Sequence, residues 1–328
     1  MMKKILSLLT ILIISMTALL GCQGKKATVE DTTAIKVAAL KGPTAMGMVK
    51  MMDDAKSKDN YEFQIMAAVD EITPSLVKGD VDIAAVPANL ASVLYNNTEG
   101  GVKVLAINTL GVLYIVENGD SIQSISDLKG KTIYTSGKGA TPEYTLDYIL
   151  KENGIDPQKD VNIEYKSEHA ECVAVLSSEE NAIAMLPQPF VTSAQTKNDK
   201  IRIALDMNDE WDKLQTEEDK SALVTGVIVV RTQFLEEHIE LVNKFLEAYK
   251  DSVEYVNSNI EEAAVMIEEQ DIIPEAVAKI ALPYCNIVFI EGEEMRTKLS
   301  GYYSVLYEQN PKSVGGTLPD DTFYYERK

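Results

Sequence analysis

Two turns that contain glycine and open expected helices hold the residues best suited to bind a ligand. One is Gly42-Pro43-Thr44 and the other is Ser136-Gly-Lys-Gly-Ala-Thr141. Each follows an apolar strand, so the free N–H groups of the next helix would point out of the carboxyl end of that strand, where open α/β sheets bind ligands. The second turn has neither the Gly-Lys-Ser/Thr of a phosphate-binding P-loop nor the dinucleotide spacing. The pair favours binding of a small molecule by backbone donors; two ordinary βα turns without a ligand are the alternative.

The sequence offers little for catalysis or metal binding. His169-Ala-Glu171 resembles half of a zinc-deaminase signature and Cys172 follows it, but no Pro-Cys-x-x-Cys comes later. The other histidine of the chain is His238, which we expect to be structural or at the surface. No Gly-x-Ser-x-Gly nucleophile elbow is present, and the abundant carboxylates fall mostly on expected solvated helix faces. We therefore predict no metal, no cofactor and no enzymatic activity.

The charge and cysteine content narrow the possible partners. The chain has 31 Lys and Arg against 51 Asp and Glu, a net charge of −20, which argues against nucleic acid because phosphate binding needs basic patches. A hydrophobic content of 45% is ordinary for a soluble globular protein. Cys172 and Cys285 are expected to be buried free thiols, with a disulfide between them as the alternative.

Strands and helices alternate from Ile35 onward, which indicates an α/β protein with a mostly parallel sheet. Gly42 and Pro43 separate the first strand from a helix that we expect to run to about Lys56. The pattern breaks at Glu117–Ser121, and a second series begins near Asp127. The strands expected in the first series are 35–40, 61–67, 81–86, 102–108 and 110–116; those of the second are 131–135, 161–165, 181–186 and 201–206.

A helical return follows the second series. Val224–Arg231 is expected as another buried strand, and apolar residues then keep helical spacing from Phe234 to Val256 over about seven turns. Further helices are expected at 260–270, 274–281 and 293–308, and the aromatic stretch 315–325 is expected to pack across a surface. The acidic segment 209–218, which contains Trp211, is expected to be a surface helix.

The N-terminus is expected to lie outside the folded part. A short basic start precedes a mostly apolar run from Ile5 to Leu20, which ends at Gly21-Cys22 and resembles a bacterial lipoprotein signal. The resemblance implies that residues 1–21 are removed and that the thiol of Cys22 is lipidated; a plain signal peptide and an uncleaved anchor are the alternatives. Residues 22–33 are polar beyond Cys22 and are expected to tether the protein to the membrane.

The assembled pattern resembles the extracytoplasmic substrate-binding proteins of ABC importers, in the branch that serves nitrate, taurine, alkanesulfonates and thiamine-precursor pyrimidines. The segments that carry the resemblance are Cys22, the unit through Gly42-Pro43-Thr44, Asp127-Leu-Lys-Gly-Lys131 and the helical return after Arg231. It implies a bilobal periplasmic-binding-protein fold of type II, in which two α/β lobes are joined by two crossover strands. Lobe 1 would be 34–118 plus 226–328, lobe 2 would be 119–225, and the hinges would lie near 117–120 and 223–226.

The resemblance also implies which residues contact the ligand, because βα turns supply the contacts in such proteins. Hydroxyls and N–H groups would donate to the ligand, Asn89 and Gln188 would donate and accept, and Lys138 would neutralise an anion or point to solvent. No Arg lies in these turns, which weakens a sulfonate assignment. The implied contacts are Gly42, Pro43, Thr44, Pro87, Ala88, Asn89, Gly111, Gly137, Lys138, Gly139, Ala140, Thr141, Pro187, Gln188 and Pro189.

The function implied by the resemblance is capture of a sulfonate, a nitrate-like anion or a pyrimidine or other vitamin precursor for an ABC import permease. The protein would be a monomer, lipid-anchored on the extracytoplasmic face of the cell membrane, and it would not bind nucleic acid. Binding would proceed without turnover. A ligand-sensing lipoprotein and an enzyme on the same bilobal fold remain the alternatives.

Overall fold

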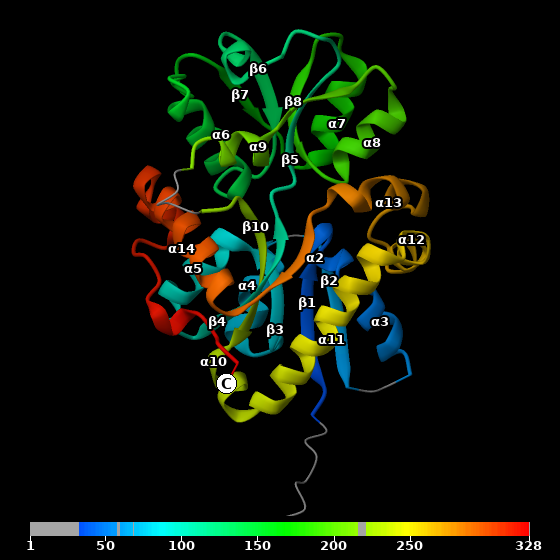
Figure 1. The fold of residues 1–328 in the computed structure, drawn as a ribbon, viewed down its shortest axis with the longest axis vertical. Helices are drawn as coiled ribbons and strands as arrows, with labels where there is room; N and C mark the ends of the chain where they lie inside the picture. Colours follow the sequence, from blue (N-terminus) through cyan, green and yellow to red (C-terminus); the bar gives the residue numbers. More distant parts are fainter. Residues whose placement is uncertain (1–32, 58–59, 68, 216–220, 328) are drawn as a thin grey trace, which may run out of the picture. The chain divides into compact units, whose positions relative to one another are not determined.

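A computed structural model describes residues 33–57, 60–67, 69–215 and 221–327 (Figure 1). The predicted signal segment, Cys22 and the tether up to residue 32 lie outside the described residues. Within the described ranges, no helix is both long enough and apolar enough to span a membrane.

Two β-sheets form the framework of residues 34–328. The first has the order β11-β4-β10-β3-β1-β2 and the second has the order β7-β6-β8-β5-β9. The strands are β1 (Ile35–Leu40), β2 (Tyr61–Met66), β3 (Ile83–Pro87), β4 (Val102–Leu110), β5 (Leu113–Glu117), β6 (Thr132–Thr135), β7 (Asn162–Tyr165), β8 (Ile183–Pro187), β9 (Arg202–Asp206), β10 (Val224–Arg231) and β11 (Ile287–Ile290).

Both sheets are mixed, so the prediction of a mostly parallel sheet is wrong. Of the nine pairings between the described strands, four are parallel. The parallel pairs belong to strand–helix–strand units, β1 to β3 and β6 to β8. The antiparallel pairs involve β5, β10 and β11. Strands β5 and β10 each follow a connection between the sheets, and β11 lies within the helical return, so none of the three is reached by a βαβ crossover. The sequence pattern of a buried strand does not distinguish these two directions.

The chain passes between the sheets twice. It leaves the first sheet after Leu110 and enters the second at Leu113, with Gly111 and Val112 as the connection. It returns between Asp206, at the end of β9, and Val224. The first connection therefore comes one strand earlier than the predicted position near 117–120, because β5 already pairs with β8 and β9 of the second sheet. The second predicted position, 223–226, lies at the entry to β10.

Helices pack against both sheets and against each other. Helices α7 and α8 contact β8, and α9 contacts β5 and β9, whereas α5 and α14 contact β4 and β10 of the first sheet. The described helices are α2 (Pro43–Met46), α3 (Val49–Ala55), α4 (Val69–Lys78), α5 (Ala88–Asn97), α6 (Thr141–Glu152), α7 (His169–Ser178), α8 (Phe190–Lys197), α9 (Met207–Asp212), α10 (Thr232–Glu237), α11 (Ile239–Ser258), α12 (Ile260–Glu269), α13 (Glu275–Ala281) and α14 (Gly292–Gln309).

Two expected helices are interrupted. The first breaks between α2 and α3 at Gly47, where a side chain would lie 2.9 Å from Ile287 Cγ2 and from Tyr249 Oη. Ser252 Oγ donates to the Gly47 carbonyl at 2.8 Å, so α11 contacts the backbone at this break. The long C-terminal run breaks at His238, which separates α10 from α11. The break at Gly47 depends on contacts between distant segments, which helical spacing does not reveal. At His238 the backbone itself leaves the helical range, with φ −133° and ψ 41°.

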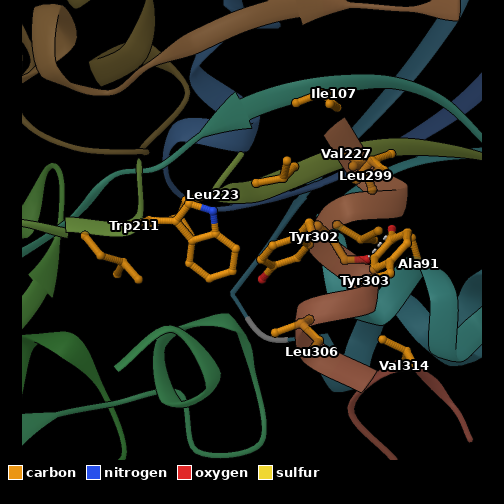
Figure 2. Packing of buried hydrophobic residues seen from close by; sticks show 14 of the residues in the cluster. Ala91, Ile107, Trp211, Leu223, Val227, Leu299, Tyr302, Tyr303, Leu306 and Val314 are labelled. Atoms are coloured by element: carbon orange, nitrogen blue, oxygen red, sulfur yellow. Dashed lines mark hydrogen bonds between the residues drawn. The ribbon is translucent and has the colours of Figure 1, made fainter. Parts of the chain in front are cut away.

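A single apolar cluster connects the two sheets on the side of α14. It contains Ile107 and Val227 from the first sheet and Ile115 and Met185 from the second. Trp211 of α9 is fully buried in it, so the predicted surface position of this segment is wrong for Trp211. Its indole ring lies 4.7 Å from the ring of Tyr148 on α6 and 5.6 Å from that of Tyr302 on α14, measured between centroids. Figure 2 shows Trp211 beside Tyr302. We call Tyr148, Trp211 and Tyr302 the aromatic seam.

Replacing Trp211 with Ala should lower the free energy of unfolding by about 3–5 kcal/mol, because the change opens a cavity in the cluster shared by the sheets. Urea unfolding followed by circular dichroism measures this loss. Tyr284→Ala is the control, since Tyr284 is 53% exposed and should lose much less. Equal losses in the two variants would contradict a special role for the seam.

Candidate functional site

The second sheet brings the turns that follow β6, β7 and β8 to one edge. Strands β7 and β8 both run parallel to β6, so the carboxyl ends of all three lie at the same edge of the sheet. Ser136 follows β6, His169 opens α7 after β7, and Gln188 follows β8. Ends of parallel strands are where open α/β sheets place ligands. This edge is therefore the candidate site of the second sheet.

Ser136 and His169 form a pair that the sequence analysis did not identify. Ser136 Oγ lies 2.5 Å from His169 Nδ1, and the imidazole packs 4.9 Å from the ring of Phe190. Burial lowers the pKa of His169 to about 4, so the ring is neutral near pH 7 and can offer its second nitrogen to a ligand. Cys172, which the sequence suggested as a possible companion, contacts the Glu168 carbonyl instead. Among the residues that the structure describes, no group of three potential metal ligands occurs.

The glycine-rich turn has the backbone that its sequence predicts, but its lysine points elsewhere. Gly137 and Gly139 have positive φ angles of 79° and 78°, which favour glycine, and Ala140 leads into α6. Lys138 is exposed, and its Nζ lies 5.5 Å from the centre of the Tyr165 ring. The Gly139 N–H donates to the Glu143 carboxylate. Two of the predicted ligand contacts thus already have protein partners: Lys138 lies beside Tyr165 of β7, and Gly139 bonds Glu143 of α6.

Thr141 and Asn89 contact each other although their helices follow strands of different sheets: α5 follows β3 of the first sheet, and α6 follows β6 of the second. Thr141 Oγ1 donates to Asn89 Oδ1 at 3.5 Å, near the limit of a hydrogen bond, and accepts from Tyr302 Oη at 3.2 Å. Asn89 Nδ2 in turn donates to the Ser313 carbonyl at 3.4 Å. Thr141 and Asn89 are only 2% and 5% exposed. The structure therefore brings together one predicted contact from each series.

The first sheet contributes a buried polar group around Thr44. Thr44 Oγ1 donates to the Leu40 carbonyl at 2.8 Å, so this hydroxyl already has a partner, and Gly42 caps α2 with φ 131°. Asn108 Nδ2 approaches the Thr44 carbonyl at 3.5 Å. A side chain at Gly226 would lie 2.5 Å from Asn108 Oδ1, which explains glycine there. Sequence analysis missed Asn108; its signal is a polar residue near the end of a buried strand, just before the chain changes sheets.

The remaining predicted contacts lie beside these groups. Gln188 is 1% exposed, and its Oε1 accepts from Thr192 Oγ1 at 3.0 Å, while its N–H donates to the Val112 carbonyl at 2.9 Å. The Gly111 carbonyl accepts from Asn286 Nδ2. Both contacts hold the connection between the sheets. The prolines and alanine of the predicted set flank helix starts: Pro43 begins α2, Pro87 and Ala88 end β3 and begin α5, and Pro187 and Pro189 lie between β8 and α8.

All four arginines of the chain are ion-paired away from these residues. Arg202 bonds the fully buried carboxylate of Glu117, and Arg231 Nη2 lies 2.7 Å from Asp82 Oδ1. The other two pairs are Arg296 with Asp321 and Arg327 with Glu291. The candidate site therefore consists of hydroxyl, amide, imidazole and backbone groups, which suit a ligand rich in hydrogen-bond acceptors.

A family model and several solved structures match this chain. The model of a family described as "ABC transporter, phosphonate, periplasmic substrate-binding protein" matches residues 51–269. A search of curated protein sequences finds no match.

Solved structures are similar across most of the chain. An ABC transporter from Parabacteroides distasonis has 24% identity and a TM-score of 0.75, covering 90% of this chain and 100% of its own. The periplasmic aliphatic sulphonate binding protein SsuA from Escherichia coli has 15% identity and a TM-score of 0.71, covering 90% and 92%. The nitrate-binding protein NrtA from Synechocystis PCC 6803 has 14% identity and a TM-score of 0.55, covering 75% and 69%. These similarities show the periplasmic-binding-protein fold, as predicted.

The lowered pKa of His169 makes stability depend on pH. Between pH about 4 and 6.5 the unfolded chain binds more protons at this residue than the folded chain does, so its contribution is complete above pH 6.5 and is lost as pH falls toward 4. Wild type should lose roughly 2–3 kcal/mol more than His169→Asn between about pH 7.5 and about pH 4.5. Urea unfolding at the two pH values measures the difference. Parallel declines in both proteins would refute the assignment.

Proposed function

Because the chain belongs to the phosphonate ABC-transporter family of periplasmic substrate-binding proteins, we propose that it captures a small acceptor-rich solute and delivers it to an ABC import permease. The family membership makes it the substrate-binding component of an import system. The observation that supports capture at the candidate site is the meeting of Asn89 and Thr141, since these two side chains come from helices that follow different sheets.

The ligand proposed for this site is held without a guanidinium. Its contacts would be the hydroxyl of Thr141, the amides of Asn89 and Gln188, and the imidazole of His169. Such donors suit an oxyanion such as a phosphonate, a sulfonate or nitrate, and they equally suit the edge of a pyrimidine or another vitamin precursor. The local donors decide the ligand, because the repulsive field of a net charge of −20 is screened beyond ~8 Å at physiological salt.

Ligand binding is proposed to act through the two lobes. The lobes would follow the two sheets, with the short connection at Gly111-Val112 and the predicted position 223–226 as the segments that bend. A ligand that contacts both Asn89 and Thr141 would favour the closed arrangement, which a permease then recognises. No bond of the ligand is broken in this cycle, so the protein would act as a carrier and not as an enzyme.

Membrane attachment is proposed to depend on Cys22. Cleavage after Gly21 and lipidation of the Cys22 thiol would place a monomeric binding protein on the extracytoplasmic face of the cell membrane, with residues 23–33 as a tether. The support is the basic start, the apolar run and the Gly21-Cys22 ending of the sequence.

A thermal-shift panel with the domain from Lys25 onward should identify the ligand class. The panel holds methylphosphonate, alkanesulfonates, taurine, nitrate, pyrimidines and aromatic acids. A true ligand at 100 times its Kd should add about 2.7 kcal/mol to the free energy of unfolding. Asn89→Ala and Gln188→Ala should each weaken that binding roughly three- to tenfold, through loss of a hydrogen bond.

Gln64→Ala is the matched control, because Gln64 is exposed on the edge strand β2 and should keep wild-type affinity. Unchanged affinity in both variants would exclude the candidate site as the place where the ligand binds. Slow conversion of the bound compound to a product would exclude the carrier function in favour of an enzyme. A folded protein that binds its ligand but supports no uptake in cells carrying the permease would favour a sensor.

Cys22→Ser should abolish incorporation of labelled palmitate and move the protein from the membrane fraction to the soluble fraction of cells that process lipoproteins. Cys172→Ser, which alters a buried thiol, should retain both the label and the membrane fraction. Palmitate incorporation into the Cys22 variant would show that the anchor lies elsewhere.

A further inference from the structure

The C-terminal helix α14 contacts the first turn of α6 at two points. Tyr302 Oη donates to Thr141 Oγ1 at 3.2 Å, and Gln309 Nε2 donates to the Tyr144 carbonyl at 3.4 Å. Helix α14 packs against β4 and β10 of the first sheet, whereas Thr141 opens the helix that follows β6 of the second. The two contacts therefore link a helix that packs on the first sheet to the start of α6, where the glycine-rich turn of the candidate site ends.

Packing of the Tyr302 ring fixes the position of its hydroxyl. Tyr302 is fully buried, and its ring contacts Trp211 at 5.6 Å and Tyr303 at 5.9 Å between centroids. Figure 2 shows this ring between the indole and the rest of α14. Burial raises the pKa of Tyr302, so its hydroxyl keeps its proton and donates throughout the physiological range.

The direction of the bond from Tyr302 determines what Thr141 can do. Thr141 Oγ1 accepts the hydrogen bond from Tyr302, so its own hydrogen points away from Tyr302, and the Thr141 hydroxyl donates to Asn89 Oδ1. A hydroxyl can both donate and accept, and its rotation is otherwise free. With Tyr302 present, Thr141 is oriented as a donor toward Asn89 and the site.

We propose that Tyr302 is a positioning residue for ligand binding: it fixes the Thr141 hydroxyl as a donor at the start of α6, so the C-terminal helix completes a site built from the two sheets. This inference rests on the proposed function of that site. It concerns a residue about 160 positions from Thr141 that does not itself contact the ligand.

The test compares wild type, Tyr302→Phe and Tyr95→Phe. Both substitutions remove one hydroxyl from a buried ring, but the Tyr95 hydroxyl donates to Asp320 at 2.7 Å, away from Thr141. Calorimetry with methylphosphonate as the probe measures affinity, and amide hydrogen exchange of residues 141–152 measures the order of α6 without any ligand. Tyr302→Phe is also combined with Thr141→Ala in a double-mutant cycle.

Tyr302→Phe should bind methylphosphonate roughly three- to tenfold more weakly than wild type, and the effect should largely vanish when Thr141 is already Ala. Exchange should rise in α6 beyond its first turn, where the amides are hydrogen-bonded, in Tyr302→Phe and not in Tyr95→Phe. Wild-type affinity with unchanged exchange would overturn the proposal, as would additive effects of the Tyr302 and Thr141 changes.

The exchange measurement separates this proposal from the function on which it rests. If wild type does not bind methylphosphonate but exchange in α6 still rises in Tyr302→Phe, Tyr302 positions Thr141 as inferred and the phosphonate assignment fails. If wild type does not bind and exchange is unchanged, the positioning role fails as well.

Discussion

The contact of Trp211 with Tyr148 and Tyr302 is the interaction on which the rest of the described structure depends. Among the described strands, the chain crosses between the sheets at two places, and the first crossing is two residues long, Gly111 and Val112. The apolar cluster around Trp211 supplies contact area, because it contains strand residues from both sheets together with α14. On the opposite faces of the sheets, the clusters that contain Val49 and Cys172 are separate from each other. The sheets thus share one core on one side only.

One polar residue of the candidate site touches that shared core, because Thr141 accepts a hydrogen bond from Tyr302, a member of the cluster. Asn89, Thr141 and Tyr302 are buried with their hydrogen bonds mostly satisfied by one another, so Asn89 and Thr141 would each exchange a protein partner for a ligand partner when a solute enters, while Tyr302 keeps its bond to Thr141. Because all four arginines pair with carboxylates elsewhere, this exchange is left to neutral groups. Neutral donors discriminate by shape and by the number of acceptors more than by charge.

Much of the fold was predictable because buried strands and amphipathic helices have a clear period. Strands β1 and β10 were predicted with the bounds that the structure has. Strand direction, the break at Gly47 and the burial of Trp211 were not predictable, because each depends on segments distant in sequence. The break at His238 was missed because the apolar spacing continues through it. In the candidate site, the glycine-rich turn indicated Thr141, and the family resemblance implied Asn89 and Gln188; the structure finds all three buried. Sequence reasoning did not single out Asn108 or Tyr302, and it offered His169 only as part of an incomplete zinc-deaminase signature, because the contacts that place these side chains come from segments distant in sequence. Lys138, chosen for its charge, is exposed beside Tyr165.

The chain contains one tryptophan, and that residue lies in the shared core. Its indole N–H donates to Ser221 Oγ at 3.0 Å, in the segment that returns the chain to the first sheet. Light emitted at tryptophan wavelengths by the folded protein therefore originates from a single point between the sheets, close to two tyrosines that can transfer excitation to it. Trp211 is therefore an intrinsic fluorescent probe between the two sheets, and a change in its emission can report movement of the sheets relative to each other without an attached dye.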